Sequence, residues 1–283
     1  MPTPENPEAT SGLPASAPSS TPAAAEPPSA PKPGDSYVQS FARGLEVIRS
    51  FSASAPQQTL SEVAAQTGLT RAGARRILLT LQTLGYVESD GRDFRLTARI
   101  LDLGFAYLSS MPIWNVAEPV VEALVESVKE SSSAAVLDGT DIVYVMRVPT
   151  HKIMKNSLGI GSRLPAYCTS MGRILLAALD DDQLQDYLAH AELQPKTSRT
   201  LHTPEALWEC LQRVRHQGWC IVDQELEQGL RSIAVPVYDA SGQVLAALNV
   251  STQAGRVSRR EFEHRFLPSM LSASRELSAQ LFT

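Results

Sequence analysis

Residues 59–85 read TLSEVAAQTGLTRAGARRILLTLQTLG, and this stretch predicts two short helices joined by a tight turn. Thr59 and Glu62 have the spacing of a capping box, which satisfies free N–H groups at the start of a helix. Gly68 easily adopts the left-handed conformation that ends a helix, and Thr70 caps the next helix. The apolar residues predicted to face the core from the second helix are Ala74, Ile77, Leu78, Leu81 and Leu84. This order of elements is typical of a helix-turn-helix.

Elements on both sides extend the motif. Apolar residues between Val38 and Ile48 recur three and four positions apart, which predicts an amphipathic helix. After the motif, two short strand-like runs flank Asp90-Gly91, and Asp-Gly is a strong hairpin signal. Together these elements predict a winged helix-turn-helix over residues 36–98.

The charge distribution points to a nucleic acid. The chain has a net charge of −5, yet residues 37–100 hold eight arginines against five acidic residues. A basic segment in an acidic chain favours an anionic polymer, and an arginine on an exposed helix face can bond both acceptors of a guanine edge. The residues that we predict to contact double-stranded DNA are Arg43, Thr70, Arg71, Ala72, Gly73, Arg75, Arg76, Arg92 and Arg95.

One residue on that face is apolar. A helical wheel turns Leu79 outward with Arg76, and we expect Leu79 to pack against the hairpin. Two alternatives to DNA binding stay open: a polar helix face that is simply solvated, and a small-molecule sensor whose winged helix binds a protein partner.

The rest of the chain divides by composition. Residues 1–35 hold ten of the nineteen prolines and no aromatic residue, so we expect a disordered tail. Residues 99–114 predict an amphipathic linker helix that ends near Pro112 and could serve in dimerisation. Residues 115–283 mix strand-like hairpins with helices without regular alternation, which favours an α+β domain built on an antiparallel sheet.

Several classes of protein are excluded. No run approaches the roughly 18 apolar residues that a membrane span needs, and the N-terminus lacks the features of a secretory signal. The three cysteines form no CxxC pair and the histidines show no HExxH spacing, so we expect no metal and no cofactor. A cytoplasmic protein without a membrane partner is the resulting expectation.

Residues 168–172 (CTSMG) resemble the G-x-S-x-G nucleophile elbow of hydrolases, with Ser170 as nucleophile. A cysteine replaces the first glycine, and its side chain would crowd that strained turn. An N-cap at Thr169 or Ser170 explains the same residues. The hydrolase therefore stays a minor alternative, and we expect a chain that is not an enzyme.

Other polar groups point to a ligand. Arg147 and Arg163 border a basic loop that also holds His151, Lys152 and Lys155, which suggests either a carboxylate site or an exposed loop. The helix N-terminus at Ser170 is a second candidate for holding a carboxylate. Asn249 and Ser251 lie on an otherwise apolar strand, where buried polar groups require a partner.

Several segments together resemble the IclR family of bacterial transcriptional regulators over residues 37–283. The segments that carry the resemblance are residues 40–45 (SFARGL), 68–71 (GLTR), 84–87 (LGYV), 141–145 (DIVYV), 163–173 (RLPAYCTSMGR) and 229–237 (GLRSIAVPV). Residues 70–76 (TRAGARR) are most similar to the subgroup that controls aromatic-acid catabolism in the protocatechuate and β-ketoadipate pathway.

The resemblance implies a winged helix, a dimerisation helix and a GAF-like effector-binding domain, in a dimer or a dimer of dimers on palindromic DNA. The family contains activators, which imply RNA polymerase as a partner, and repressors. The effector residues that the resemblance implies are Ile160, Gly161, Leu230, Ser232, Asn249 and Ser251. With Arg147 and Ser170, these predict a site for a small aromatic or dicarboxylic acid.

Overall fold

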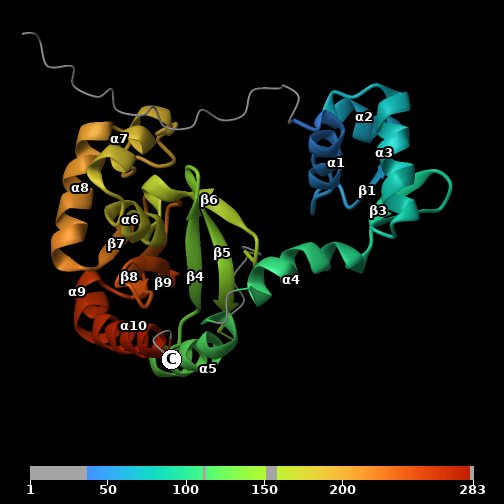
Figure 1. The fold of residues 1–283 in the computed structure, drawn as a ribbon. Helices are drawn as coiled ribbons and strands as arrows, with labels where there is room; N and C mark the ends of the chain where they lie inside the picture. The colour runs from blue at the N-terminus through green and yellow to red at the C-terminus, as the bar shows by residue number, and fades with distance from the viewer. Residues whose placement is uncertain (1–36, 111–112, 151–157, 281–283) are drawn as a thin grey trace, which may run out of the picture. The chain divides into compact units, whose positions relative to one another are not determined.

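The computed structural model describes residues 37–110, 113–150 and 158–280 (Figure 1). The chain forms two compact units, one ending at Ile100 and the other beginning at Leu101. The predicted tail, residues 1–35, lies outside the described residues, and so do His151, Lys152 and Lys155 of the basic loop. Among the described helices, none has the length and hydropathy needed to cross a membrane.

The first unit is the predicted winged helix. Its elements are α1 (Gln39–Ser50), β1 (Gln57–Thr59), α2 (Leu60–Thr67), α3 (Arg71–Thr83), β2 (Val87–Ser89), β3 (Asp93–Leu96) and the 3-10 turn η1 (Ala98–Ile100). The strands form a 3-stranded antiparallel sheet in the order β1-β3-β2. The sequence predicts the hairpin but not β1, which has three residues and pairs with β3 from a distant part of the chain.

The predicted caps are confirmed. The Thr59 hydroxyl accepts a bond from Glu62 N at 3.3 Å, and the Glu62 carboxylate accepts one from Thr59 N at 2.7 Å. Gly68 ends α2 with a φ of 66°, a left-handed conformation that glycine adopts without steric cost. The Thr70 hydroxyl accepts a bond from Gly73 N at 3.1 Å. These local signals fix where α2 and α3 begin and hence the turn between them.

One prediction about α3 is wrong. Ala74, Leu78 and Leu81 are buried as expected, but Leu84 is 51% exposed because it lies at the C-cap, where the chain leaves the helix. Leu79 is 38% exposed and does not belong to the apolar core of this unit, and its packing against the hairpin stays a prediction.

The second unit is built on a 6-stranded antiparallel sheet in the order β6-β5-β4-β9-β8-β7. Its strands are β4 (Ser132–Asp138), β5 (Asp141–Val148), β6 (Arg163–Pro165), β7 (Cys220–Asp223), β8 (Leu230–Tyr238) and β9 (Val244–Gln253). Its helical elements are α4 (Leu101–Ser109), α5 (Ile113–Val128), η2 (Ala166–Cys168), α6 (Ser170–Ala177), α7 (Asp181–His190), α8 (Pro204–Gln217), α9 (Arg259–Glu261), the π-helical turn η3 (Phe262–Phe266) and α10 (Leu267–Gln280).

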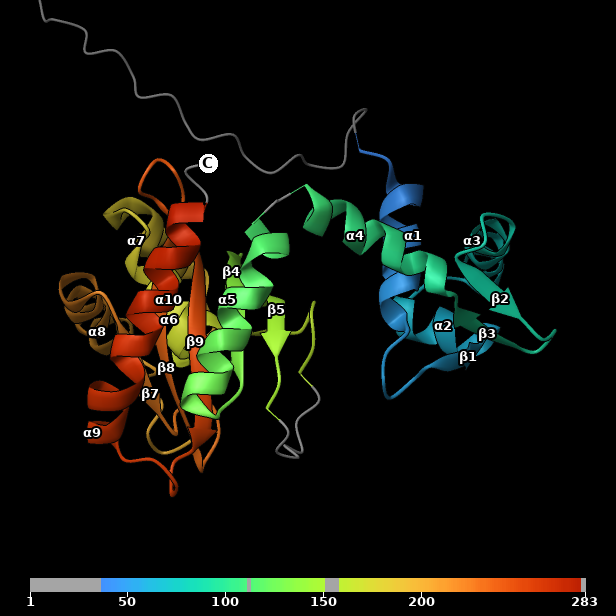
Figure 2. The ribbon, with the colours of Figure 1, turned by 90° about the horizontal axis from the view of Figure 1, so that it is seen from below.

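Helices cover both faces of this sheet (Figure 2). Side chains alternate along each strand, so β9 directs Leu248 and Val250 to one face and Ala247 to the other. The first face packs on α5 and α10. The second packs on α6, and α8 packs on α6; residues of α7 and α8 belong to the same apolar cluster. The last helical segment, residues 259–280, is divided by the π-helical turn η3 into α9 and α10.

The approach of α6 to the preceding turn is very close. A Cβ atom at Gly172 would lie 2.1 Å from the carbonyl oxygen of Ala166, which is far inside van der Waals contact. Only glycine fits at this position, because any side chain would push α6 away from η2. The start of α6 is therefore fixed against the sheet edge.

Candidate functional site

The first candidate site is the outward face of α3. Arg71, Arg75 and Arg76 are all exposed there. In the part of the chain that the structure describes, none of their guanidinium groups forms an ion pair. Arginines that bury no apolar surface and bind no carboxylate are available to an external anion. Ala72 lies exposed between them and leaves room for close approach.

Other predicted DNA contacts have different surroundings. Thr70 and Gly73 form the cap of α3, so their role in the structure is to fix the start of the helix. Arg43 on α1 and Arg92 in the hairpin turn are exposed. Arg95 on β3 bonds Glu88 of the neighbouring strand at 2.7 Å, which the sequence did not predict.

The hairpin itself is held by a carboxylate. Asp90 accepts backbone bonds from Arg92 N at 3.0 Å and Asp93 N at 2.9 Å. These bonds favour the ionised form and hold the pKa of Asp90 below its usual value. The turn therefore presents Arg92 on a defined backbone.

The second candidate site is a small cavity of about 30 Å³ in the second unit, between the start of α6 and the sheet. Its lining residues are Tyr144, Leu164, Cys168, Thr169, Ser170, Met171, Val222, Leu226, Leu230, Ser232 and Asn249. Most of the wall is apolar, and the few polar groups converge from α6, β8 and β9. That composition is typical of a small-molecule site.

The cavity contains four of the eight predicted effector residues: Ser170, Leu230, Ser232 and Asn249. It does not contain Arg147, Ile160, Gly161 or Ser251. Ile160 is 62% exposed on its loop, and Gly161 N donates to Tyr144 O at the neighbouring strand. The prediction missed Tyr144 and Thr169, because only the folded sheet brings β5 beside the start of α6.

The basic loop does not supply a free cation at Arg163. Its guanidinium bonds Asp138 at 2.5 Å and Asp141 at 3.2 Å, and these bonds raise the pKa of Arg163 above its usual value. The hypothesis that Arg163 receives a carboxylate is therefore wrong. These acidic partners face each other at the turn between β4 and β5.

Ser170 has an unusual polar environment. Its hydroxyl oxygen is buried and has no hydrogen-bond partner in the described part of the chain. Thr169 caps the helix instead, accepting a bond from Gly172 N at 3.1 Å. Asn249 is also buried, and its side-chain oxygen Oδ1 accepts a hydrogen bond from Ser133 N at 3.1 Å.

The remaining ionisable groups of the wall are neutral at pH 7. Burial raises the pKa of the Cys168 thiol to about 11 and that of the Tyr144 phenol to about 12, although nearby Arg147 opposes the shift of Tyr144. No Lys, Arg or His is among the described lining residues. Positive potential at the wall comes from the N-terminus of α6, and also from Arg147 near Tyr144 and Arg173 near Cys168.

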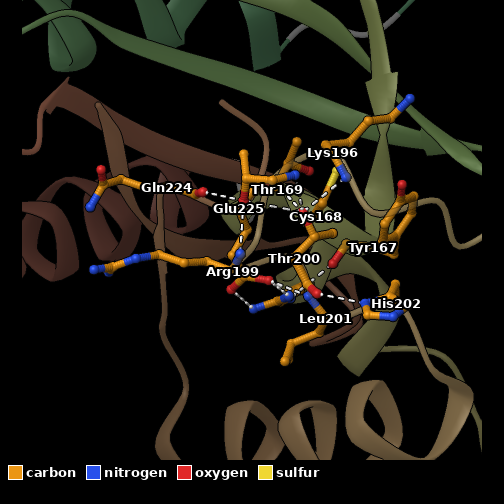
Figure 3. Close-up of polar contacts among 12 residues, drawn as sticks. Tyr167, Cys168, Thr169, Lys196, Arg199, Thr200, Leu201, His202, Gln224 and Glu225 are labelled. Carbon is orange, nitrogen blue, oxygen red and sulfur yellow. Dashed lines mark hydrogen bonds and ion pairs between the residues drawn. The ribbon is translucent and has the colours of Figure 1, made fainter. Parts of the chain in front are cut away.

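A buried ion pair lies next to the segments that form the cavity wall. Arg173 on α6 is 2% exposed, and its Nη1 and Nη2 bond Glu225 Oε1 and Oε2 at 2.7 and 2.5 Å. Figure 3 shows Glu225 among polar contacts with Leu201 and Thr200. Burial disfavours the charged guanidinium, but the bonds to Glu225 outweigh it and raise the pKa of Arg173. The sequence alone gave no role to this pair, whose members are far apart in the chain.

The comparisons with known proteins fit this geometry. A model described as the IclR helix-turn-helix domain matches residues 40–91, and one described as the bacterial transcriptional regulator IclR C-terminal domain matches residues 105–279. The chain belongs to the IclR family of bacterial transcriptional regulators. The family membership also removes the hydrolase alternative, because this IclR chain is a regulator and Ser170 has no base bonded to it among the described residues.

Two further matches support the assignment within the IclR family. The Pca regulon regulatory protein of Pseudomonas putida is 55% identical over 247 residues, which cover 87% of this chain and 85% of that protein. A transcriptional regulator from Rhodococcus sp. RHA1 has a solved structure with a TM-score of 0.79 and 50% identity, covering 87% of this chain and 98% of that one.

One solved IclR-type domain contains a ligand. It is a double mutant of the PobR inducer-binding domain from Acinetobacter, in complex with 3-hydroxybenzoic acid. It has a TM-score of 0.56 and 30% identity, and the match covers 58% of this chain and 96% of that domain.

Proposed function

We propose that this IclR regulator controls genes of aromatic-acid catabolism and responds to a small aromatic carboxylic acid, which widens the cavity beside the start of α6 when it binds. The observation that carries the proposal is the Ser170 hydroxyl, which is buried, has no partner among the described residues and lies in the wall at the first turn of α6. Leaving a hydroxyl without a bond costs free energy, which a ligand oxygen would recover.

The chemistry of the cavity favours an anionic head on an apolar body. A carboxylate at the N-terminus of α6 interacts favourably with the helix dipole and accepts a hydrogen bond from the Ser170 hydroxyl. Apolar side chains such as Leu164, Met171 and Leu230 surround the rest of the ligand. The similarity to the Pca regulon regulatory protein and to an inducer domain that holds 3-hydroxybenzoic acid supports an aromatic acid.

Calorimetry tests this proposal. The full chain is titrated with benzoate, hydroxybenzoates, phthalates, short dicarboxylates and the methyl ester of each acid that binds. We expect an aromatic acid to bind and its neutral ester to bind at least tenfold more weakly, because a charge-assisted bond is lost. Equal binding of acid and ester would contradict the carboxylate site. If only a short dicarboxylate bound, the proposal of an aromatic effector would be wrong.

We infer that the winged helix binds double-stranded DNA in the cytoplasm as part of a dimer on a palindromic operator. The free arginines of α3 provide the charge, and one winged helix reads too few base pairs to select a genomic site. The exposed apolar side chains of α4 supply a seam, with Leu101 and Phe105 each 68% exposed. The same proposal includes a dimer of dimers as a higher oligomer and, if the protein is an activator, a contact with RNA polymerase.

Sedimentation and gel shifts test this inference together. We expect a dimer at micromolar concentration, and binding of DNA that weakens steeply as salt increases because phosphate contacts release counterions. A monomer at that concentration would contradict the dimer. Binding without salt dependence would favour a protein partner for the winged helix.

A further inference from the structure

The outward face of α3 carries a line of four side chains with alternating chemistry. Ala72, Arg76, Leu79 and Thr83 follow one another at intervals of four, three and four residues. Such intervals place side chains on one line along a helix. The line lies opposite the buried side of the helix, and all its members are exposed.

A hydrogen bond within α3 makes the part of this line around Leu79 less polar. The Thr83 hydroxyl donates to Leu79 O at 2.9 Å, so its proton is engaged within α3. Leu79 is 38% exposed and lies outside the apolar core of its unit. The arginine at position 76 is therefore bordered by the methyl group of Ala72 on one side and by the leucine on the other.

The free arginines indicate what covers this apolar strip. Arg71, Arg75 and Arg76 surround it without an ion pair in the described residues, so the partner is an anion. The major groove of DNA presents phosphates at its rims and only one apolar group on its floor, the C5 methyl group of thymine. A protein surface that covered Leu79 would also have to neutralise three arginines.

We propose that Leu79 is a specificity-determining residue that contacts a thymine methyl group in the operator half-site. The inference rests on the proposed binding of DNA by α3. Residues 76 and 79 are separated by about 4.5 Å along the helix axis, and base pairs are about 3.4 Å apart. The thymine is therefore next to the base pair that Arg76 contacts, or one step beyond it.

The experiment uses a duplex that the full-length wild-type chain selects from a randomised pool. The duplex is made again with deoxyuridine in place of each thymine in turn, which removes only the C5 methyl group. At one thymine per half-site we expect the wild-type chain to bind about fourfold more weakly, the effect of losing one buried methyl group. Leu79→Ala should bind the thymine and uracil duplexes with equal affinity.

Two variants control this comparison. Leu84→Ala removes another exposed leucine at the end of the same helix, away from the line, and should keep the uracil effect of the wild-type chain. Leu79→Met retains an apolar side chain and should keep most of the uracil effect. Circular dichroism establishes that each variant is folded.

The outcomes separate this inference from the function on which it rests. A wild-type chain that selects no duplex would overturn both. Selection of a duplex with no uracil effect at any position would overturn the inference alone, and so would a Leu79→Ala chain that discriminates uracil as the wild type does.

Discussion

Arg173 and Glu225 join helix α6 to the loop between β7 and β8 through two parallel hydrogen bonds inside the effector-binding unit. Helix α6 begins at Ser170, and the loop contains Leu226 and leads to Leu230; these three residues line the cavity, so the pair connects two segments that form its wall. The pair thus fixes the distance between two walls that a ligand would contact.

Breaking this pair from one side should destabilise the second unit. Glu225→Gln leaves the guanidinium of Arg173 buried without a counter-charge, and such losses cost about 3–5 kcal/mol. We expect a large fall in the free energy of unfolding, measured by chemical denaturation. The control is Glu263→Gln, which removes the half-buried partner of the exposed Arg259 and should cost at most about 0.5 kcal/mol. Similar losses in both variants would contradict the structural role of the buried pair.

The hydroxyl of Ser170 should matter for the effector and not for the fold. Ser170→Ala should weaken binding of an aromatic acid by about tenfold or more, since a hydrogen bond to a charged group is lost, and should leave the unfolding free energy unchanged or slightly raised. Thr252→Val is the matched control, because Thr252 is also buried with an unpartnered hydroxyl among the described residues but does not line the cavity. Equal affinity of the Ser170→Ala and wild-type chains in calorimetry would refute the assignment.

Arg76→Ala should reduce specific DNA binding more than non-specific binding. The side chain is exposed on the outward line of α3, where an arginine reaches base edges, so its loss costs about 1–3 kcal/mol of discrimination. Arg95→Ala, on the wing, should weaken both kinds of binding alike and reduce the salt dependence. Gel shifts with a selected and a scrambled duplex measure the ratio, and an unchanged ratio for Arg76→Ala would place base recognition elsewhere.

Alkaline pH should destabilise the second unit through its buried thiols. Burial raises the pKa of Cys220 to about 12, from a usual value of 9.0, so the folded chain keeps a proton that the unfolded chain releases. The contribution to stability is fully present below pH 9 and is lost as pH rises toward 12. Chemical denaturation between pH 8 and pH 11 should show this decline. Cys220→Ala should decline less steeply, and identical slopes would contradict the role of this thiol.

Local signals in the sequence are sufficient for the helices and the hairpin of the winged helix. Capping residues such as Thr59 and Thr70 act within four positions of the chain, so their effect is visible in the sequence. The short strands β1 and β6 were not predicted, because three residues give no alternating pattern and their pairing depends on distant strands. Helical periodicity gave the direction of Leu79 but not what covers it.

The effector cavity was predicted only in part for the same reason. Polar residues on an apolar strand marked Asn249, which lines the cavity, and Ser251, which does not; the family resemblance added Ser232, which lines it. The positive charge of Arg163 suggested a carboxylate site, but Asp138 and Asp141 bond its guanidinium once β5 and β6 pair. Arg173 and Glu225 are separated by 52 positions, and no local pattern connects them.

The contact between Gly172 and Ala166 limits how this protein can evolve. Because a single methyl group at position 172 would collide with the backbone, the start of α6 accepts no substitution that changes its position. Under the proposed function, a change of effector preference would have to come from the opposite wall, where Leu230, Ser232 and Asn249 lie on β8 and β9. The wall at α6 would then hold the acid group, and the wall on the strands would select which acid binds.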